Sequence, residues 1–234
     1  MKDLLIELFS EEIPSGMQAL GSMNFKKLMT DGLVDAGLTY QNAAVFFTPT
    51  RIVLIVSGLT DTSSSEILER RGPRTDAPEN AVLGFLRSTG LKRNDLEVQK
   101  VKNGEFFFAK IKKPGRPSGA IVSETLKKTI ESFPWPKSMR WGAGTMKWAR
   151  PLKNIMGILY DETGANVIDL TIDGLVANNK SVGHRFLAGQ SFSVNSFDEL
   201  KLKLKKSFVI LDQAERRAEI KNSATNGAFA LGFD

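Results

Sequence analysis

The chain has 234 residues, of which 41% are hydrophobic and 25% charged, a composition typical of a folded protein rather than a disordered one. It has no cysteine and a single histidine, His184, which excludes disulfides, thiolate nucleophiles and metal sites built on cysteines or on two histidines. No run approaches the roughly 18 apolar residues of a membrane helix, and acidic residues interrupt the apolar start. These features predict a cytoplasmic protein with no membrane association.

The net charge of +6 is unevenly distributed. Residues 1–35 carry three basic and six acidic side chains, a net charge of −3. Residues 100–153 carry thirteen basic and three acidic side chains, a net charge of +10. A basic excess of this size predicts a surface that binds a polyanion.

The first sixty residues are predicted to form a strand, a helix and two further strand segments. Residues 2–9 are rich in Leu and Ile and indicate a mostly buried strand. Pro14 suits a first helical turn, and apolar residues then recur every three or four positions until Gly37. A short segment at residues 46–47 and the β-branched run over residues 51–59 favour strands.

The stretch that follows marks an internal boundary. Residues 61–65 are polar and serine-rich, and residues 72–78 are rich in Gly and Pro, as loops are. We therefore predict a first domain over residues 1–62, a basic region over residues 63–220 and an atypical tail over residues 221–234. The basic region is either a second domain or continuous with the first.

The basic region mixes helices and strands without a regular βαβ repeat, which favours an α+β fold over a doubly wound sheet. Asn103 and Gly104 supply the positive φ angles of a tight hairpin turn. The expected hairpins pair residues 98–102 with 105–111 and residues 152–160 with 165–172, and the expected helices cover residues 80–89, 120–132, 200–206 and 212–221.

A basic, aromatic stretch over residues 133–151 contains all three tryptophans of the chain. Cations neutralise phosphates, and tryptophan or guanidinium planes stack on unpaired bases, so this mixture suits RNA. The alternative is that the tryptophans anchor a core and the cations form a solvated rim. The candidate RNA-binding residues of this stretch are Lys137, Arg140, Trp141, Lys147 and Arg150.

A second candidate lies at residues 182–186, where a glycine precedes His184 and Arg185. An imidazole and a guanidinium there could contact a phosphate or an acyl-adenylate, although a lone histidine is more often structural. The acidic pair Glu11 and Glu12 follows the first strand and precedes Pro14, where carboxylates favour a helix N-terminus. Helix capping is the favoured interpretation for this pair.

Several nucleotide-binding patterns are not met. Gly142 and Gly144 lack the third glycine of a dinucleotide fingerprint, and the sequence has no phosphate-binding loop of the Gly-Lys-Ser/Thr type. Paired carboxylates for hydrolysis are not assigned either. The sequence therefore predicts no catalytic residue, no metal ligand and no ATP site.

Taken in order, the motifs of this chain resemble the N-terminal part of the β subunit of bacterial heterotetrameric glycyl-tRNA synthetase. The resemblance extends over about residues 3–220, and residues 222–234 depart from the family pattern. The motifs that carry it are LIELFSEEIP at residues 5–14, TPTRIVL at 48–54, RRGP at 70–73, PKSMRWG at 136–142, RP at 150–151 and GHRF at 183–186.

The resemblance implies a share in the ATP-dependent attachment of glycine to its tRNA, in an assembly of two α and two β subunits. The family's ATP and glycine are used by the α subunit, so no cofactor is expected on this chain. The implied partners are the α subunit and glycine tRNA, with this region binding tRNA and supporting assembly. Seven residues are the candidates for tRNA binding, namely Lys137, Arg140, Trp141, Lys147, Arg150, His184 and Arg185. The implied fold is similar to the B3/B4-type domain of phenylalanyl-tRNA synthetase β subunits, without an editing residue that can be transferred.

Two alternatives remain open at the level of sequence. The chain could be a structural domain that contacts the α subunit or later β-subunit domains without touching RNA. A hydrolytic editing enzyme is less favoured, because no nucleophile or metal set can be named.

Overall fold

The computed structural model describes residues 1–101 and 104–233 and divides the chain into two compact units. Unit 1 consists of Met1–Thr62 together with Pro117–Asp234, and unit 2 consists of Ser63–Arg116. Unit 2 is thus inserted between two segments that fold together.

Unit 1 is built on an antiparallel five-stranded sheet in the order β2-β3-β1-β7-β8. The central strand β1 pairs with β3 on one side and with β7 on the other, for example Ile6 with Leu54 and with Gly157. The strands are β1 (Lys2–Ser10), β2 (Asn42–Thr48), β3 (Arg51–Leu59), β7 (Leu152–Asp161) and β8 (Gly164–Val167).

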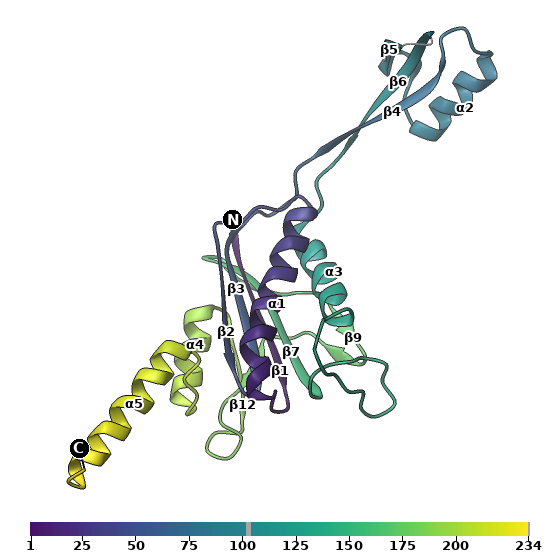
Figure 1. Ribbon diagram of the computed structural model, residues 1–234. Helices are drawn as coiled ribbons and strands as arrows, with labels where there is room; N and C mark the ends of the chain where they lie inside the picture. Colours follow the sequence, from purple (N-terminus) through teal and green to yellow (C-terminus); the bar gives the residue numbers. More distant parts are fainter. Residues whose placement is uncertain (102–103, 234) are drawn as a thin grey trace. The chain divides into compact units, whose positions relative to one another are not determined.

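Both faces of this sheet are buried. Successive side chains of a strand point to opposite faces, so each strand contributes to two cores. Leu4, Ile6 and Leu8 of β1 join the core formed with helices α1 (Ser15–Asp35) and α3 (Ser118–Glu131), which lie side by side in Figure 1. The opposite face packs against helix α4 (Phe197–Lys206). Its core contains Leu5, Val53, Ile55, Met156 and Ile158 of the strands with Leu200 and Leu204 of the helix.

Helices α4 (Phe197–Lys206) and α5 (Gln213–Ala230) begin at side-chain caps. Ser196 Oγ accepts a hydrogen bond from the Glu199 N–H at 3.2 Å, and Asp212 accepts from the Ala214 and Glu215 N–H groups. The remaining strands of unit 1 form two short pairs, β9 (Thr171–Ile172) with β10 (Leu175–Val176) and β11 (Lys180–Val182) with β12 (Ser191–Ser193).

Unit 2 is a three-stranded antiparallel sheet with one helix (Figure 1). Val82 and Phe85 of the helix and Phe106 and Ala109 of the central strand are buried. Its elements are β4 (Glu66–Arg74), α2 (Glu79–Thr89), the short 3₁₀ helix η1 (Arg93–Asp95), β5 (Leu96–Val101) and β6 (Gly104–Lys113), in the strand order β4-β6-β5.

The structure confirms the α+β class and both predicted hairpins, and it changes the prediction for the loop at residues 72–78. The loop expected around residues 72–78 starts later, because β4 runs to Arg74 and accommodates Pro73 at a register shift against β6. The predicted turn residue Asn103 lies outside the described residues, while β5 and β6 on either side of it pair as expected.

The division into domains also differs from the sequence-based one. Residues 63–220 do not stay together, because β7 pairs with β1 and returns the chain from Pro117 onward to unit 1. Residues 221–230, which belong to the predicted atypical tail, continue the helix α5. The basic segment 100–153 is therefore divided between the two units, and its charge of +10 is shared between them.

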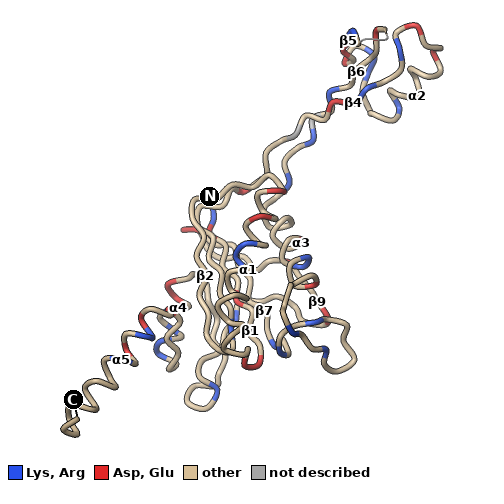
Figure 2. Tube along the Cα trace, in the orientation of Figure 1, with Lys and Arg blue, Asp and Glu red and all other residues tan. Residues whose placement is uncertain are grey.

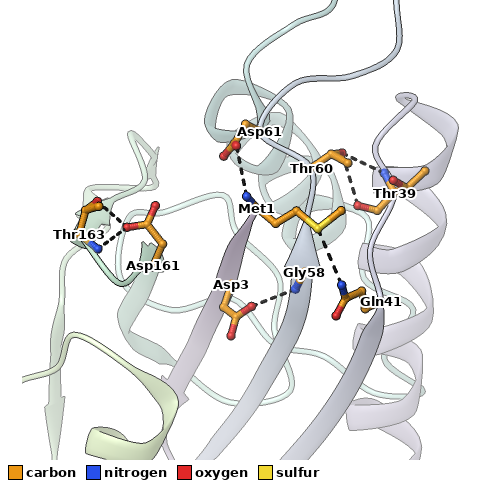
Figure 3. A network of polar contacts seen from close by, with 9 residues as sticks. All are labelled: Met1, Asp3, Thr39, Gln41, Gly58, Thr60, Asp61, Asp161 and Thr163. Atoms are coloured by element: carbon orange, nitrogen blue, oxygen red, sulfur yellow. Dashed lines mark hydrogen bonds and ion pairs between the residues drawn. The ribbon is translucent and has the colours of Figure 1, made fainter.

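One end of the sheet anchors the two connections to unit 2. The Asp3 carboxylate accepts a hydrogen bond from the Gly58 N–H at 2.9 Å (Figure 3). The Thr60 hydroxyl accepts a hydrogen bond from the Thr39 N–H at 3.1 Å and donates one to the Thr39 carbonyl at 3.4 Å. Next to this network, Thr62 forms a bridge with Pro117. The chain thus leaves and re-enters unit 1 at adjacent positions.

Among the residues that the structure describes, no helix is both long enough and apolar enough to cross a membrane.

Candidate nucleic-acid interface and adjoining pocket

The loop between α3 and β7, residues 133–151, is anchored by an aromatic cluster. The ring of Phe133 lies 4.7 Å from that of Trp135 and 4.8 Å from that of Trp148, and all three side chains are buried. Trp135 also packs on Gly21 of α1, where a Cβ would lie 2.5 Å from the indole ring. The interpretation as core anchors is therefore correct for Trp135 and Trp148, which cannot stack on a base.

The cations of this loop point outward. Lys137, Arg140 and Lys147 are exposed, and none of them has an ion-pair partner within the described part of the chain. Trp141 is half-buried against the core, and Arg150 is half-buried with its guanidinium donating to the Ala149 carbonyl at 3.0 Å. Figure 2 shows the basic residues along the loop between α3 and β7.

The loop is held in place by a backbone bridge within it and by a carboxylate from outside it. Met139 and Trp148 exchange two backbone hydrogen bonds of 2.9 and 3.2 Å. The Asp173 carboxylate accepts from the N–H groups of Thr145 and Met146 at 3.3 and 3.4 Å. The cations are thus presented from a fixed backbone rather than from an unsupported loop.

A pocket of about 300 Å³ lies at the end of the sheet where β1 ends. Three segments far apart in the sequence form most of it, namely residues 9–12, 48–51 and 183–185, with further contributions from Lys153, residues 208–210 and Arg216. His184 and Arg185 line this pocket, whereas Lys137, Arg140, Trp141, Lys147 and Arg150 do not. The structure therefore separates the seven predicted tRNA-binding residues into two groups.

The two groups of candidate residues lie near each other in the folded chain. Arg150 lies two residues before Leu152, the first residue of β7, which pairs with Ser10 at the end of β1. The Glu11 N–H donates to the Pro151 carbonyl at 3.0 Å. The basic loop thus ends next to the pocket.

A buried ion pair fixes the segment that precedes His184. Arg51 Nη1 lies 3.0 Å from Glu7 Oε2, with 1% and 0% of the two side chains exposed. Ser181 Oγ donates to Glu7 Oε1 at 2.7 Å, and Arg51 Nη2 donates to the Val182 carbonyl at 2.9 Å. Sheet strands β1 and β3 therefore hold the backbone from which His184 and Arg185 project.

The imidazole of His184 is oriented by its own loop. Its Nδ1 accepts from the backbone N–H groups of Phe186 and Leu187, both at 3.3 Å. The backbone N–H of His184 donates to the Ser207 carbonyl at 2.9 Å. Since Nδ1 acts as an acceptor, the proton of the neutral ring is assigned to Nε2. His184 is thereby set up as a hydrogen-bond donor.

The acidic pair after β1 does not cap a helix. The N-cap of α1 is Pro14 and the first turn of α1 contains no acidic residue. Glu11 instead pairs with Lys153, whose hydrogen bond and charge hold the pKa of the Glu11 carboxyl below its ordinary value. Glu12 lies 3.3 Å from Arg185. The predicted capping role is therefore wrong, because the chain continues past this pair before the helix begins.

Sequence reasoning assigned no role to Glu7, Arg51, Lys153 or Phe208. Glu7 and Arg51 could have been recognised as charged residues inside apolar strands, which occur there only when paired. Lys153 and Phe208 carry no such signal. Among the described residues, no group of three potential metal ligands comes together.

Comparison with known proteins identifies the family. The sequence model of the family described as "Glycyl-tRNA synthetase beta subunit" matches residues 4–233. The chain is 53% identical over 234 residues to the glycine–tRNA ligase beta subunits of Cereibacter sphaeroides and Paracoccus denitrificans, and 51% identical to that of Ruegeria sp.. In each case the match covers the whole chain but only 34% of the relative. The chain spans about a third of the length of these relatives and belongs to the glycyl-tRNA synthetase β-subunit family, corresponding to its N-terminal part.

Proposed function

We propose that this chain supports the ATP-dependent attachment of glycine to its tRNA by binding tRNA through the exposed cations Lys137, Arg140 and Lys147. The strongest support comes from the loop over residues 133–151. Buried tryptophans anchor this loop, and its unpaired cations face solvent. Cations without carboxylate partners remain available to phosphates.

The local charge favours the same role. Residues 117–153, which belong to unit 1, contain seven basic and two acidic residues, a net charge of +5. Neutralising phosphates with lysine and arginine releases condensed counterions, so binding of this kind weakens steeply as salt increases. Arg150, Trp141, His184 and Arg185 extend the proposed contact toward the pocket.

In this proposal the chain is a non-catalytic part of the synthetase. ATP and glycine are bound and activated by the α subunit, and the complex contains two α and two β subunits. The family membership and the names of the relatives support these partners. We assign no catalytic residue to this chain.

A second candidate function is assembly without RNA contact. It is favoured by exposed apolar side chains on α1, where Leu20 and Met23 lie one turn apart and outside the core. In this version the apolar face contacts the α subunit or later β-subunit domains, and the basic loop is solvated.

The test is a titration of the chain with glycine tRNA and a non-cognate tRNA over a range of salt concentrations. Arg140→Ala and Lys147→Ala should each weaken binding and reduce the slope of log K against log salt by about 1. Lys27→Ala is the matched control, because Lys27 is an exposed lysine on α1 that is paired with Asp31. It should leave both affinity and slope unchanged.

The two candidates give different results. No binding of either tRNA at low salt would exclude the RNA-binding function of this chain. In that case Leu20→Asp and Met23→Asp should lower the amount of α subunit that copurifies with the full-length β subunit. Retained copurification would exclude assembly through this face.

A further inference from the structure

We propose that the pocket formed by residues 9–12, 48–51 and 183–185, together with the exposed rings of Phe186 and Phe208, binds one unpaired nucleotide of an RNA strand. This inference rests on the proposed function, because it assigns a second and chemically different contact to the same RNA.

The first observation is the backbone of Phe208. Helix α4 ends in a Schellman motif, in which the Val209 N–H donates to the Leu204 carbonyl at 2.9 Å and the Phe208 N–H donates to the Lys205 carbonyl at 3.2 Å. Phe208 occupies the position with a left-handed backbone, φ 62°, which favours glycine. A bulky side chain there is strained.

The strain at Phe208 is not offset by burial. The side chain of Phe208 is 63% exposed, so it contributes little to the core, yet it lines the pocket. A residue that is unfavourable for the backbone and contributes little to packing points to a role in binding.

The second observation is another exposed aromatic ring, that of Phe186, which does not line the pocket itself but whose centroid lies 6.0 Å from that of the His184 ring in the lining. Phe186 is 80% exposed and follows Arg185, whose guanidinium lies 4.9 Å from the ring centroid. The loop is fixed by the hydrogen bonds of His184 to Ser207 and to residues 186 and 187, so the ring is presented from an ordered backbone. Exposed aromatic rings and guanidinium planes are the groups on which unpaired bases stack.

The third observation is the polar lining. Lys153 and Arg185 are cations of the lining, where they pair with the carboxylates of Glu11 and Glu12, respectively. His184 provides a donor through Nε2. Arg51 also lines the pocket, and its buried Nε has no hydrogen-bond partner among the described residues. The carboxylates Glu11 and Glu12 can accept hydrogen bonds from the exocyclic amine of a base or from ribose hydroxyls.

The size of the pocket limits the ligand. A volume of about 300 Å³ is at the lower end of the range of small-ligand pockets, roughly 300–1,000 Å³. A single nucleotide fits a pocket of this volume. The bases of a duplex are stacked and paired, so none of them can enter the pocket. The site therefore fits an unpaired position of the RNA and not its helical arms.

The experiment compares a six-nucleotide single-stranded RNA with a duplex of the same sequence, by fluorescence anisotropy with the 234-residue chain. Phe208→Gly and Phe186→Ala should weaken single-strand binding by roughly 5- to 150-fold, the effect of losing one stacked base. Phe229→Ala is the matched control, because Phe229 is 83% exposed on α5 and does not line the pocket. Phe208→Gly suits the backbone at this position, so a loss of binding in this variant does not result from misfolding.

Titration with glycine tRNA separates this inference from the proposed function. Phe208→Gly should lower tRNA affinity without changing the salt slope, whereas Arg140→Ala should change the slope. If Arg140→Ala has its expected effect and Phe208→Gly binds single strands and tRNA like the wild type, the nucleotide site is overturned and the proposed function stands. If neither RNA binds at low salt, both fail. If Phe186→Ala and Phe208→Gly reduce α-subunit copurification and leave RNA binding intact, the rings contact protein and the inference is wrong.

Discussion

At the scale of single residues, the pair Glu7 and Arg51 connects the core of unit 1 to the pocket. Both side chains are buried, and each Arg51 terminal nitrogen and each Glu7 oxygen has a partner. A buried charge without its partner is strongly unfavourable, whereas a pair replaced by apolar groups of similar volume is often tolerated. The pair therefore constrains which substitutions this site accepts.

Glu7→Leu is expected to destabilise the protein by about 3–5 kcal/mol, because it leaves the Arg51 guanidinium buried and unpaired. The double variant Glu7→Leu with Arg51→Met should lose less than the sum of the two single variants. Chemical denaturation of all four proteins measures this coupling. Additive losses would show that the two residues act independently. The exposed pair of Lys27 and Asp31 is the control, and its removal should change stability far less, because solvent screens an exposed ion pair.

Trp148 and Trp141 differ in burial although both lie in the basic loop. Trp148→Ala should cost about 3–5 kcal/mol of stability, because the side chain is fully buried among Phe133 and Trp135. Trp141→Ala should cost clearly less, since Trp141 is only half-buried. Thermal unfolding of both variants measures the two losses of stability. A larger loss for Trp141→Ala than for Trp148→Ala would contradict this prediction.

At the scale of elements, the C-terminal end of α4 provides a test of backbone strain. Phe208→Gly and Phe208→Ala both remove the ring, but only glycine relieves the left-handed backbone, which costs other residues roughly 1–2 kcal/mol. The glycine variant should therefore be more stable than the alanine variant by about 1 kcal/mol. Equal melting temperatures would mean that the backbone relaxes in the alanine variant.

The contact between α4 and α5 is expected to depend on pH. The Lys205 ammonium donates a hydrogen bond to the Glu215 carboxylate at 2.6 Å and, together with its charge, holds the pKa of that carboxyl below its ordinary value. A depressed carboxyl pKa stabilises the folded state above the ordinary value, and this contribution is lost as the pH falls through the folded pKa. An NMR titration of the Glu215 carboxyl carbon should give the lowered value, and Lys205→Gln should raise it. Lys206→Gln should leave it unchanged.

At the scale of the whole molecule, the insertion of unit 2 suggests that unit 1 folds without it. Thr62 and Pro117 are bridged, so the two connections meet where a tight turn can join them. Replacing residues 63–116 by Asn-Gly should preserve the melting temperature of unit 1 and the tRNA contacts of Arg140 and Lys147. Circular dichroism and the tRNA titration measure both. Loss of cooperative unfolding would show that unit 1 requires unit 2.

The sequence by itself determined the local structure and the family. The antiparallel hairpins, the helices near residues 15–35 and 118–131 and the α+β class follow from periodicity and turn residues, which are local properties of the chain. The motif order indicated the glycyl-tRNA synthetase β-subunit family, which the comparisons confirm. The likeness to the phenylalanyl-tRNA synthetase domain and the roles of the seven candidate residues stay predictions.

Only the tertiary structure decided which residues share a site. The pairing of β7 with β1 removed residues 117–220 from the predicted basic region and split its charge between two units. The same pairing brought Lys153 to Glu11 and placed residues 48–51 and 183–185 around one pocket. Strand pairing across more than a hundred residues is a non-local interaction, and the spacing of residues along the chain does not encode it. Burial likewise assigned Trp135 and Trp148 to the core, because side-chain type alone does not distinguish a core anchor from an exposed ring.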